Sequence, residues 1–448
     1  MYVYTIPYQN KYILYRPLKK LAFLANAALV NLIAQAQEDR QQCLSIEQNK
    51  EALQFLDTLG FWEPDPPVPP PPAGDHSFHP TVATLFLTTA CNLRCTYCYA
   101  FGGESYVQTL ASDLGRRAID IVCQNATDAG QESFELSFHG GGEPTLAETH
   151  FRTLIEYARA KELPCQISVA TNGYWTEEER EWILNHLDSI SLSFDGIQAV
   201  QDRQRPLASG QGTFENVLGT IRAMDRRHFP YGIRLTVTNE SIDDLERSIE
   251  FLCTETACRT FQVEPAFSHG RAQHEGTALT RTERFAAAFL EAYDVARSCG
   301  RHLYYSGARP WVITSRFCQA PERALIVTPN GTLTACYEIY NSDHSLAQDF
   351  FFGELSENGA MHIETTARQQ FFEKVQERRA LCQDCFCYWH CAGDCPSKTF
   401  APEGDGHLHF GERCDLNRRI TKELLLRYIA DGDGIWRGTD RVMMVVDD

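Results

Sequence analysis

The chain has 448 residues, of which 43% are hydrophobic and 22% charged, enough for two or three ordinary globular domains. Its formal net charge of −18 argues against a general nucleic-acid binder, because affinity for a phosphate backbone depends on Lys and Arg. We therefore expect no nucleic-acid partner.

The chain contains 17 cysteines, and its first ten residues lack the charged and apolar segments of a secretory signal. The most apolar early run, residues 21–36, is too short and too polar to span a bilayer. Cysteines in a reducing compartment serve metal or redox chemistry more often than disulfides. The sequence therefore predicts a cytoplasmic protein without a membrane partner, in which cysteines hold metal.

Residues 1–63 are predicted to form a small α+β unit. Residues 2–6 and 11–15 are rich in β-forming side chains and are joined by a turn. Apolar residues recur at helical spacing over 21–32, and residues 51–59 predict a second amphipathic helix. Strands followed by helices resemble the winged-helix units that bind the leader of a ribosomal precursor peptide. A structural cap on the next domain is the alternative interpretation.

A proline-rich linker is predicted at residues 64–80. Eight prolines lie between residues 62 and 80, and four of them are consecutive. Such a segment is stiff and extended, since proline neither continues a helix nor donates to a sheet. The first domain boundary is therefore expected here.

From residue 81 onward, strand-like runs alternate with helical stretches. The strands are predicted at 82–88, 133–138, 166–170, 189–194, 233–237 and 260–263. The helices are predicted at 113–124, 147–160, 177–187, 214–226, 242–253 and 281–298. Six such units predict an α/β fold in which a parallel sheet curls into a partial (β/α)6 TIM-like barrel over residues 81–304. Functional residues in such barrels lie on the loops after the strands.

Three cysteines, Cys91, Cys95 and Cys98, directly follow the first predicted strand. Three thiolates would hold three irons of a 4Fe–4S cluster and leave the fourth iron open to a ligand. Half of a zinc site is the alternative, although zinc motifs usually contain two cysteine or histidine pairs. The C-x3-C-x2-C spacing resembles the signature of radical S-adenosylmethionine (SAM) enzymes, in which the open iron binds the amino and carboxylate groups of SAM.

The same resemblance implies SAM contacts at later strand ends. A Gly-Gly-Glu-Pro run follows the second strand, and in the family its backbone binds the SAM ammonium. The fourth strand ends in Ser-x-Asp-Gly, where the family's serine contacts the ribose. A downstream arginine pairs with the carboxylate, for which its planar fork is suited, although Gln201 replaces the usual histidine of that motif. The implied residues are Tyr97 (beside adenine), Gly141, Gly142, Glu143, Pro144, Ser193 and Arg205. A glycine-rich turn, a surface ion pair for Arg205 and a core position for Tyr97 are the competing interpretations.

Residues 305–448 are predicted to be a cysteine-rich, loop-like domain that ends in a helix near 420–428. The spacing of seven cysteines and Gly331 resembles, position for position, the SPASM extension, which holds two auxiliary 4Fe–4S clusters. The family pattern assigns Cys382, Cys385, Cys391 and Cys414 to the outer cluster and Cys318, Cys336 and Cys395 to the inner one. The inner cluster then has either an open iron or an unusual fourth ligand, for which Cys387 is a candidate. A zinc ribbon is the alternative.

Together these segments cover residues 81–414 and imply a radical SAM oxidoreductase with SAM and three 4Fe–4S clusters. A low-potential flavodoxin- or ferredoxin-like protein would donate electrons. A 5′-deoxyadenosyl radical would abstract hydrogen from a ribosomally synthesised precursor peptide, and a thioether, carbon–carbon or carbon–oxygen crosslink would form. An anaerobic sulfatase-maturating enzyme and a non-catalytic metal-binding scaffold are the alternatives. His139, Glu264 and Asp394 are candidates for the pocket lining, and no catalytic base is assigned.

Overall fold

The computed structural model describes residues 1–72, 78–104, 106–356, 360–400 and 411–438. Within these residues the strands form one sheet of eleven strands and one of four. No helix of this part of the chain is both long and apolar enough to cross a membrane.

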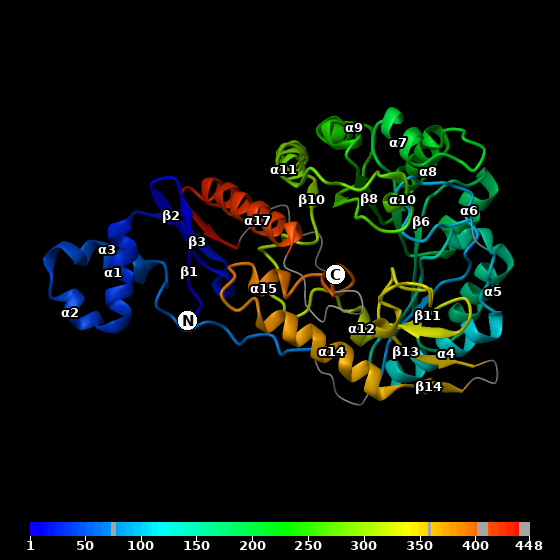
Figure 1. The fold of residues 1–448 in the computed structure, drawn as a ribbon, viewed down its shortest axis with the longest axis horizontal. Coiled ribbons are helices and arrows are strands. Elements are labelled where there is room, and N and C mark those ends of the chain that lie inside the picture. Colours follow the sequence, from blue (N-terminus) through cyan, green and yellow to red (C-terminus); the bar gives the residue numbers. More distant parts are fainter. Residues whose placement is uncertain (73–77, 105, 357–359, 401–410, 439–448) are drawn as a thin grey trace.

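Seven parallel strands form the first part of the large sheet, in chain order from one to the next. The strands are β4 (Val82–Leu85), β5 (Phe134–Phe138), β6 (Cys165–Thr171), β7 (Ser189–Ser193), β8 (Tyr231–Val237), β9 (Thr260–Pro265) and β10 (His302–Tyr304). The helices between them are α4 (Ser112–Asp128), α5 (Glu148–Arg159), α6 (Glu177–His186), α7 (Gln198–Gln204), α8 (Phe214–Arg226), α9 (Leu245–Glu255), α10 (Arg271–Glu275) and α11 (Thr282–Ser298). The helices line the outside of a curved sheet (Figure 1). The six predicted units are confirmed, and the sheet is open, with β10 at one edge.

Residues along each parallel strand alternate between two environments, as the pleat requires. Leu136, Ile167 and Leu192 are completely buried. The neighbours of these residues in sequence, such as Ser137 and Ser191, are polar and border a cavity. One face of the sheet thus packs on the helices, and the opposite, concave face is polar.

The large sheet continues into the cysteine-rich region, which the sequence had suggested to be loops. Strand β11 pairs in parallel with β4, and three antiparallel strands follow it. These strands are β11 (Ala324–Val327), β12 (Thr332–Thr334), β13 (Phe351–Leu355) and β14 (Met361–Ile363). The helices here are α12 (Ala320–Arg323), α13 (Ala347–Phe350), α14 (Thr365–Ala380), α15 (Tyr388–Cys391), α16 (Pro396–Thr399) and α17 (Glu412–Asp431). Strands of three to five residues carry little local signal, and an existing sheet edge stabilises them.

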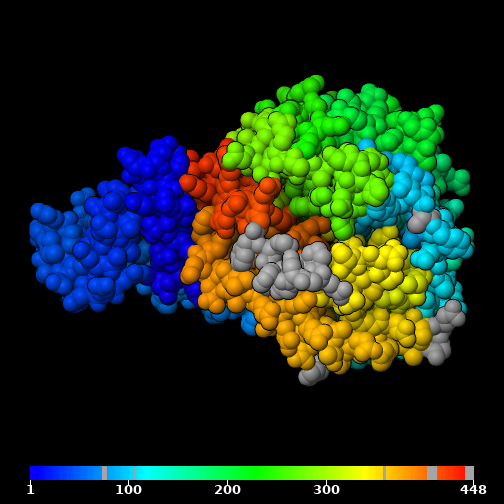
Figure 2. Space-filling view, in the orientation of Figure 1, coloured from blue at the N-terminus to red at the C-terminus, as the bar shows by residue number. Residues whose placement is uncertain are grey.

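The N-terminal unit contains the small sheet and three helices, and it projects from the rest of the molecule (Figure 2). Its elements are β1 (Tyr4–Tyr8), β2 (Lys11–Arg16), β3 (Leu21–Ala25), α1 (Ala27–Glu38), α2 (Arg40–Leu44) and α3 (Lys50–Thr58). The prediction of one helical run over 21–32 is wrong in its first half, because residues 21–25 pair with β2. Asn26 begins the helix instead, since its side chain accepts a hydrogen bond from the Leu29 amide at 2.8 Å.

The fourth strand of the small sheet comes from the far end of the chain. Strand β15 (Ile435–Arg437) pairs antiparallel with β3, so that β1 and β15 form the sheet edges. The indole ring of Trp436 is 3% exposed and lies 6.2 Å from the Tyr15 ring. The first and last described parts of the chain therefore share one core.

Residues 64–72 form neither helix nor strand, as predicted for the linker. They pass beside α14 (Figure 1). The carbonyl of Pro72 accepts a hydrogen bond from the Gln376 side chain at 3.0 Å, and that of Pro70 accepts one from Arg316 at 3.2 Å. The linker thus contacts the cysteine-rich region at residues 70–72.

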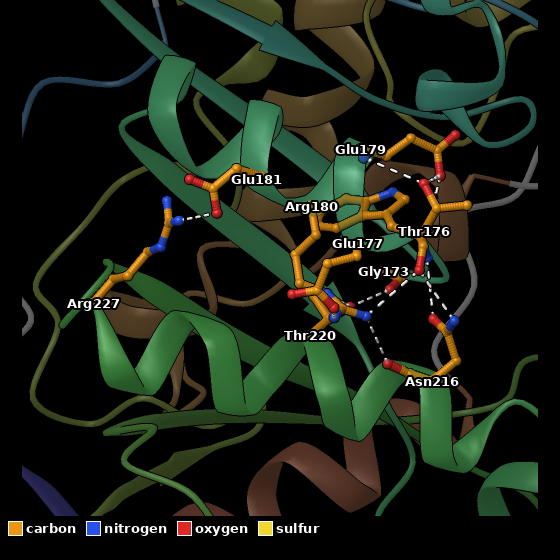
Figure 3. A network of polar contacts seen from close by, with 10 residues as sticks. Gly173, Thr176, Glu177, Glu179, Arg180, Glu181, Asn216, Thr220 and Arg227 are labelled. Carbon is orange, nitrogen blue, oxygen red and sulfur yellow. Dashed lines mark hydrogen bonds and ion pairs between the residues drawn. The ribbon is translucent and has the colours of Figure 1, made fainter.

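A polar network fixes the loop after β6 (Figure 3). Arg180 on α6 donates through Nε to the Thr220 hydroxyl on α8 at 3.0 Å, and that hydroxyl donates to the Gly173 carbonyl at 2.8 Å. Thr176 and Glu179 form a capping box at the start of α6. This network supports one of the strand ends that border the site.

Candidate functional site

The cysteine triplet lies on the loop after β4, in contact with the glycine-rich loop after β5. The amide of Glu143 donates to the carbonyl of Ala90 at 2.8 Å. A Cβ atom at position 142 would lie only 2.0 Å from that carbonyl oxygen, and Gly141 has a φ of +75°. Only glycine permits this approach and this conformation. The cysteine triplet and the glycine-rich run, which lie about fifty residues apart in the sequence, thus form one surface.

Arg271 of α10 holds the triplet loop from the other side. Its backbone amide donates to the Cys98 carbonyl at 2.8 Å, and its guanidinium donates to the Cys95 carbonyl at 2.5 Å. The Arg271 side chain is only 4% exposed. No motif in the sequence marked this arginine, because its contacts are to backbone atoms far away in sequence.

In the protein alone, the thiols of Cys91 and Cys95 favour the protonated form. Burial raises the pKa of Cys91 to about 12 and that of Cys95 to about 11, the latter against the opposing effect of Arg205. The Nη1 atom of Arg205 lies 3.8 Å from the Cys95 sulfur. A bound metal would deprotonate these thiols, so affinity for a cluster would be coupled to proton release.

Asp195 brings together two of the predicted SAM-binding residues. Its carboxylate accepts hydrogen bonds from the Tyr97 hydroxyl at 2.6 Å and from Arg205 Nε at 3.0 Å. The Arg205 guanidinium lies 5.2 Å from the centre of the Tyr97 ring. Asp195 is 3% exposed and also accepts from the Thr236 amide. Sequence reasoning gave Asp195 no role, although it is the aspartate of the Ser-x-Asp-Gly run.

The other predicted SAM-binding residues lie around the same strand ends. The buried Glu143 carboxylate accepts from the Thr171 hydroxyl and the Asn172 amide, both at 2.8 Å. Burial raises the pKa of Glu143 despite these hydrogen bonds. Its side chain therefore joins the loops after β5 and β6, and its backbone remains beside the triplet. Pro144 begins a buried helical turn, and Ser193 ends β7.

The fold also brings together the three cysteines of the predicted inner set, Cys318, Cys336 and Cys395. The Cys336 thiol has a raised pKa because it is buried and because Glu338, Cys395 and Cys318 lie near it. Backbone amides of Glu338 and Ala320 lie 3.4 Å from the sulfurs of Cys336 and Cys318, respectively. The three cysteines therefore form one group, next to an acidic side chain.

Glu338 extends the inner set towards the concave sheet face. Its carboxylate accepts from Lys398 Nζ at 2.6 Å and from the Ser397 hydroxyl at 3.0 Å. Burial opposes its ionisation, yet Lys398 and Ser397, with a smaller contribution from Arg234, lower the pKa of Glu338 to about 2. The acid is therefore charged at neutral pH.

The predicted outer set lines a single small pocket of about 80 Å³, together with a fifth cysteine. The five are Cys382, Cys385, Cys387, Cys391 and Cys414. Cys387 thus lies with the outer set, and its placement does not favour it as the fourth ligand of the inner cluster. Arg378 Nη2 lies 3.0 Å from the Cys414 sulfur, and Asn417 Nδ2 lies 3.5 Å from that of Cys391. These donors suit sulfur atoms that carry negative charge.

Asp394 lies between the inner and outer sets. Its carboxylate accepts from Arg413 Nε at 2.6 Å, from Asn417 at 3.1 Å and from the Cys395 amide at 2.7 Å. It has left-handed backbone, with a φ of +71°. The aspartate that was a candidate for the pocket lining thus orients the loop between Cys391 and Cys395.

His139 and Glu264, the other two candidates, differ in their environments. His139 stacks on Tyr337 at 4.9 Å, and burial lowers its pKa to about 3, so that it is neutral at pH 7. Its ring borders the cavity on the concave face. Glu264 accepts from the Gln262 amide group and the Ser306 backbone amide, both at 3.0 Å.

No three His, Cys, Asp or Glu side chains in the described residues converge as for one metal ion. Space for a larger iron–sulfur cluster beside the three cysteines is indicated instead by the glycine that packs against Cys91. A Cβ at Gly102 would lie 3.2 Å from both Cys91 Cβ and the Gly141 carbonyl oxygen. The absence of a side chain at Gly102 leaves space beside Cys91 for a bound group.

Comparison with known proteins agrees with these two cysteine regions. Residues 85–252 match the model of the radical SAM superfamily, and residues 318–386 match that of the SPASM iron–sulfur cluster-binding domain. The chain therefore contains a radical SAM domain and a SPASM domain. A sporulation killing factor maturation protein and a sulfatase-maturating enzyme are among its relatives.

Two curated relatives are 27% identical to the chain. The sporulation killing factor maturation protein SkfB of Bacillus subtilis aligns over 307 residues, 65% of this chain and 66% of SkfB. The serine-type anaerobic sulfatase-maturating enzyme of Klebsiella aerogenes aligns over 326 residues, 69% of this chain and 77% of that enzyme. The similarity in sequence therefore extends both to a killing factor maturation protein and to a sulfatase-maturating enzyme.

Two solved structures share the fold. The structure of anSMEcpe with bound AdoMet and the Kp18Cys peptide has a TM-score of 0.62 at 17% identity and covers 79% of this chain and 99% of its own. The structure of Streptococcus suis SuiB bound to its precursor peptide SuiA has a TM-score of 0.52 at 11% identity and covers 92% of this chain and 98% of its own.

Proposed function

We propose that this protein is a peptide maturase that installs an oxidative crosslink, a thioether, carbon–carbon or carbon–oxygen bond, in a ribosomally synthesised precursor peptide. The observation that carries the proposal is the contact between the triplet loop and the Gly141–Gly142 backbone, at the carboxyl ends of the adjacent strands β4 and β5. When bound, SAM and its cluster would supply a 5′-deoxyadenosyl radical that abstracts hydrogen, and auxiliary clusters would take up the remaining electron.

The chain's own residues would bind and orient these groups. The triplet Cys91, Cys95 and Cys98 would hold the SAM-binding cluster. We assign the SAM ammonium to the backbone of residues 141–144, the ribose to Ser193 and the carboxylate to Arg205. Because Arg205 Nε is held by Asp195, the guanidinium is oriented before SAM binds. Tyr97, fixed by the same carboxylate, would pack beside the adenine.

The cysteines of the inner and outer sets would hold the auxiliary clusters. The inner set of Cys318, Cys336 and Cys395 lies beside Glu338, and the outer set of Cys382, Cys385, Cys391 and Cys414 lies beside Arg378 and Asn417. Each set would hold a 4Fe–4S cluster, which gives three clusters in all. A low-potential flavodoxin- or ferredoxin-like donor in the cytoplasm would reduce them.

We divide the chain into a leader-binding unit at 1–63, a linker at 64–80, a radical SAM domain at 81–304 and a SPASM domain at 305–448. The order of three strands and three helices in the first unit supports a leader-binding role. The fold similarity to SuiB, whose structure contains a precursor peptide, covers 92% of this chain and supports it further.

The first test uses anaerobically reconstituted protein. We expect about twelve irons per chain, as three 4Fe–4S clusters require, and 5′-deoxyadenosine after reduction with dithionite. Bound zinc, or iron without SAM cleavage, would instead support a non-catalytic metal-binding scaffold.

Sulfatase maturation, the oxidation of Cys or Ser to formylglycine, is the second candidate, and the similarity to the Klebsiella enzyme favours it. The two reactions differ in their products, because formylglycine is an aldehyde and a crosslink is not. Two peptides serve as substrates: one derived from a sulfatase, and a precursor peptide encoded by a neighbouring reading frame. The products of both reactions are then treated with a hydrazide, which reacts with aldehydes. A hydrazide-reactive product would identify a sulfatase maturase, whereas an inert, oxidised precursor would identify a crosslinking enzyme.

A further inference from the structure

The concave face of the large sheet borders a cavity of about 390 Å³. Bulky branched side chains usually fill the interior of such barrels. Here the lining is mostly small or polar, and it includes Ser137, Ser168, Ser191, Arg234, Gln262 and Tyr304. The cavity extends from the amino ends of β7 and β9 to His139, beside the glycine-rich loop. A cavity of this volume has room for part of a peptide substrate.

Arg234 brings a positive charge into this cavity. Its side chain is exposed to the cavity, although both of its neighbours in sequence are buried in the core. Among the described residues, its guanidinium makes no hydrogen bond or ion pair. A guanidinium has five N–H donors in a fixed plane and matches a carboxylate with two parallel hydrogen bonds.

Two acids that interact with residues of the cavity lining already have other partners. Glu264 accepts from Gln262 and from the Ser306 amide. Glu338, which is within electrostatic reach of Arg234, is bound by Lys398 and Ser397. The Tyr304 hydroxyl donates to the Gln262 side-chain oxygen. The cavity therefore contains a guanidinium without a bound anion. A ligand that removed water from this guanidinium would bind poorly unless the ligand itself supplied an anion.

The register of the sheet places Arg234 close to the reacting region. Arg234 of β8 is the direct partner of Ser193 of β7, the residue that we assign to the SAM ribose. A carboxylate could come from SAM itself or from the peptide. Arg205, held by Asp195 beside the Cys95 sulfur, is already placed for SAM. The cavity continues from Arg234 away from that site, to Pro230 and Thr260, which favours the peptide.

We propose that Arg234 binds a carboxylate of the peptide substrate, from an Asp or Glu side chain or the C-terminus, and thereby fixes which residue faces the SAM site. The substrate would carry an acidic group next to the residue that is modified. This inference rests on the proposed peptide maturase function, and it names a specificity determinant for it.

The test is an anaerobic selection from a random heptapeptide library on phage, with the reconstituted, SAM-loaded protein as bait. Four baits are compared: the native protein, Arg234→Gln, Arg234→Glu and the control Arg222→Glu. Arg222 lies on the surface of α8, where it pairs with Glu255, and is 51% exposed. Circular dichroism and iron content check that each bait is folded.

We expect the native protein and Arg222→Glu to enrich Asp and Glu about tenfold, which corresponds to about 1.4 kcal/mol for one ion pair. Arg234→Gln should lose this enrichment, and Arg234→Glu should select Lys and Arg instead. If Arg234→Glu does not fold, the loss in Arg234→Gln decides. The proposal is wrong if the native protein shows no acidic preference or if all four baits select the same peptides.

The affinity for SAM, measured by equilibrium dialysis, distinguishes the two sources of carboxylate. A loss of more than about tenfold in Arg234→Gln would assign the residue to SAM and overturn the proposal. Peptide selection does not depend on turnover. A protein that selects acidic peptides but never cleaves SAM would contradict the proposed function and leave the binding role of Arg234 supported.

Discussion

The cysteine triplet and the outer cysteine set are built in opposite ways. The triplet lies within eight consecutive residues of one loop, and its surroundings are backbone carbonyls and glycines from neighbouring strand ends. The outer set spans residues 382–414 and combines the segment around α15 with the first turn of α17. Cysteine spacing indicated both sets, but the outer pocket forms only when the segment around α15 packs against α17.

The largest contrast is expected between Cys95→Ala and Cys385→Ala. Each change removes one thiolate and should lower the iron content by about four per chain. Cys95→Ala should reduce 5′-deoxyadenosine formation to background, because its cluster would bind SAM. Cys385→Ala should retain SAM cleavage but lose the peptide product. The two variants are compared by iron analysis and by mass spectrometry of the peptide, and identical losses would show that the two sets do not divide these roles.

A smaller but still severe effect is expected for Gly142→Ala. The new Cβ would lie 2.0 Å from the Ala90 carbonyl oxygen, so that one of the two loops must move. We expect a loss of more than about 100-fold in SAM cleavage, since misplacement by about 1 Å can cost that much.

The matched control for this change is Gly219→Ala on α8. Its Cβ would make only ordinary contacts, 3.6 Å or longer, with Arg180. Alanine favours a helix more than glycine does, so this variant should be at least as stable as the native protein. A Gly142→Ala enzyme with native activity would mean that the close contact of the two loops is unnecessary.

The variant Trp436→Ala tests whether strand β15 stabilises the N-terminal unit. Removal of a buried indole should lower the free energy of unfolding by about 4 kcal/mol. Urea denaturation followed by circular dichroism measures this change. Ile46→Ala, at a position that is 47% exposed, serves as the control. An equal, small effect of both changes would indicate that β15 adds little to the small sheet.

The smallest effect concerns pH. The pKa of His139 is lowered to about 3 in the folded protein, whereas the ordinary pKa of a histidine is about 6.5. Below about pH 6.5 the unfolded chain therefore binds a proton at this residue that the folded protein does not bind. Stability should therefore fall as the pH falls from about 6.5 towards 3, by about 2 kcal/mol between pH 7 and pH 5 from this residue. His139→Gln should remove this part of the pH dependence in anaerobic urea titrations. His228→Gln, at an exposed position, should retain it.

Periodicity predicted the large sheet well. The six strand and helix pairs of the barrel were recognised because buried and polar residues alternate along strands such as β7, and because amphipathic helices separate them. Strands β11 to β14 were missed, since three to five residues carry too little pattern. Leu21–Ala25 was misassigned because Leu21, Leu24 and Ala28 fit a helical period as well as a strand followed by a cap at Asn26.

The site residues divide in the same way. Cysteine spacing and the glycine-rich run named the triplet and its neighbour, and both belong to contiguous motifs. Asp195, Arg271 and Glu338 were not predicted, because the cited partner of each lies far away along the chain. The separation is 98 residues for Asp195 and Tyr97, 176 for Arg271 and Cys95, and 60 for Glu338 and Lys398. A single sequence contains no signal for such pairs.

The sequence by itself determined which residues can bind metal and which strands alternate, because these properties depend on residue type and local period. Only the tertiary structure decided that Cys387 joins the outer set, that Trp436 completes the N-terminal sheet and that Arg234 enters the cavity without an anionic partner. The physical reason is that burial and ion pairing depend on which distant segments pack together, and local patterns do not specify that.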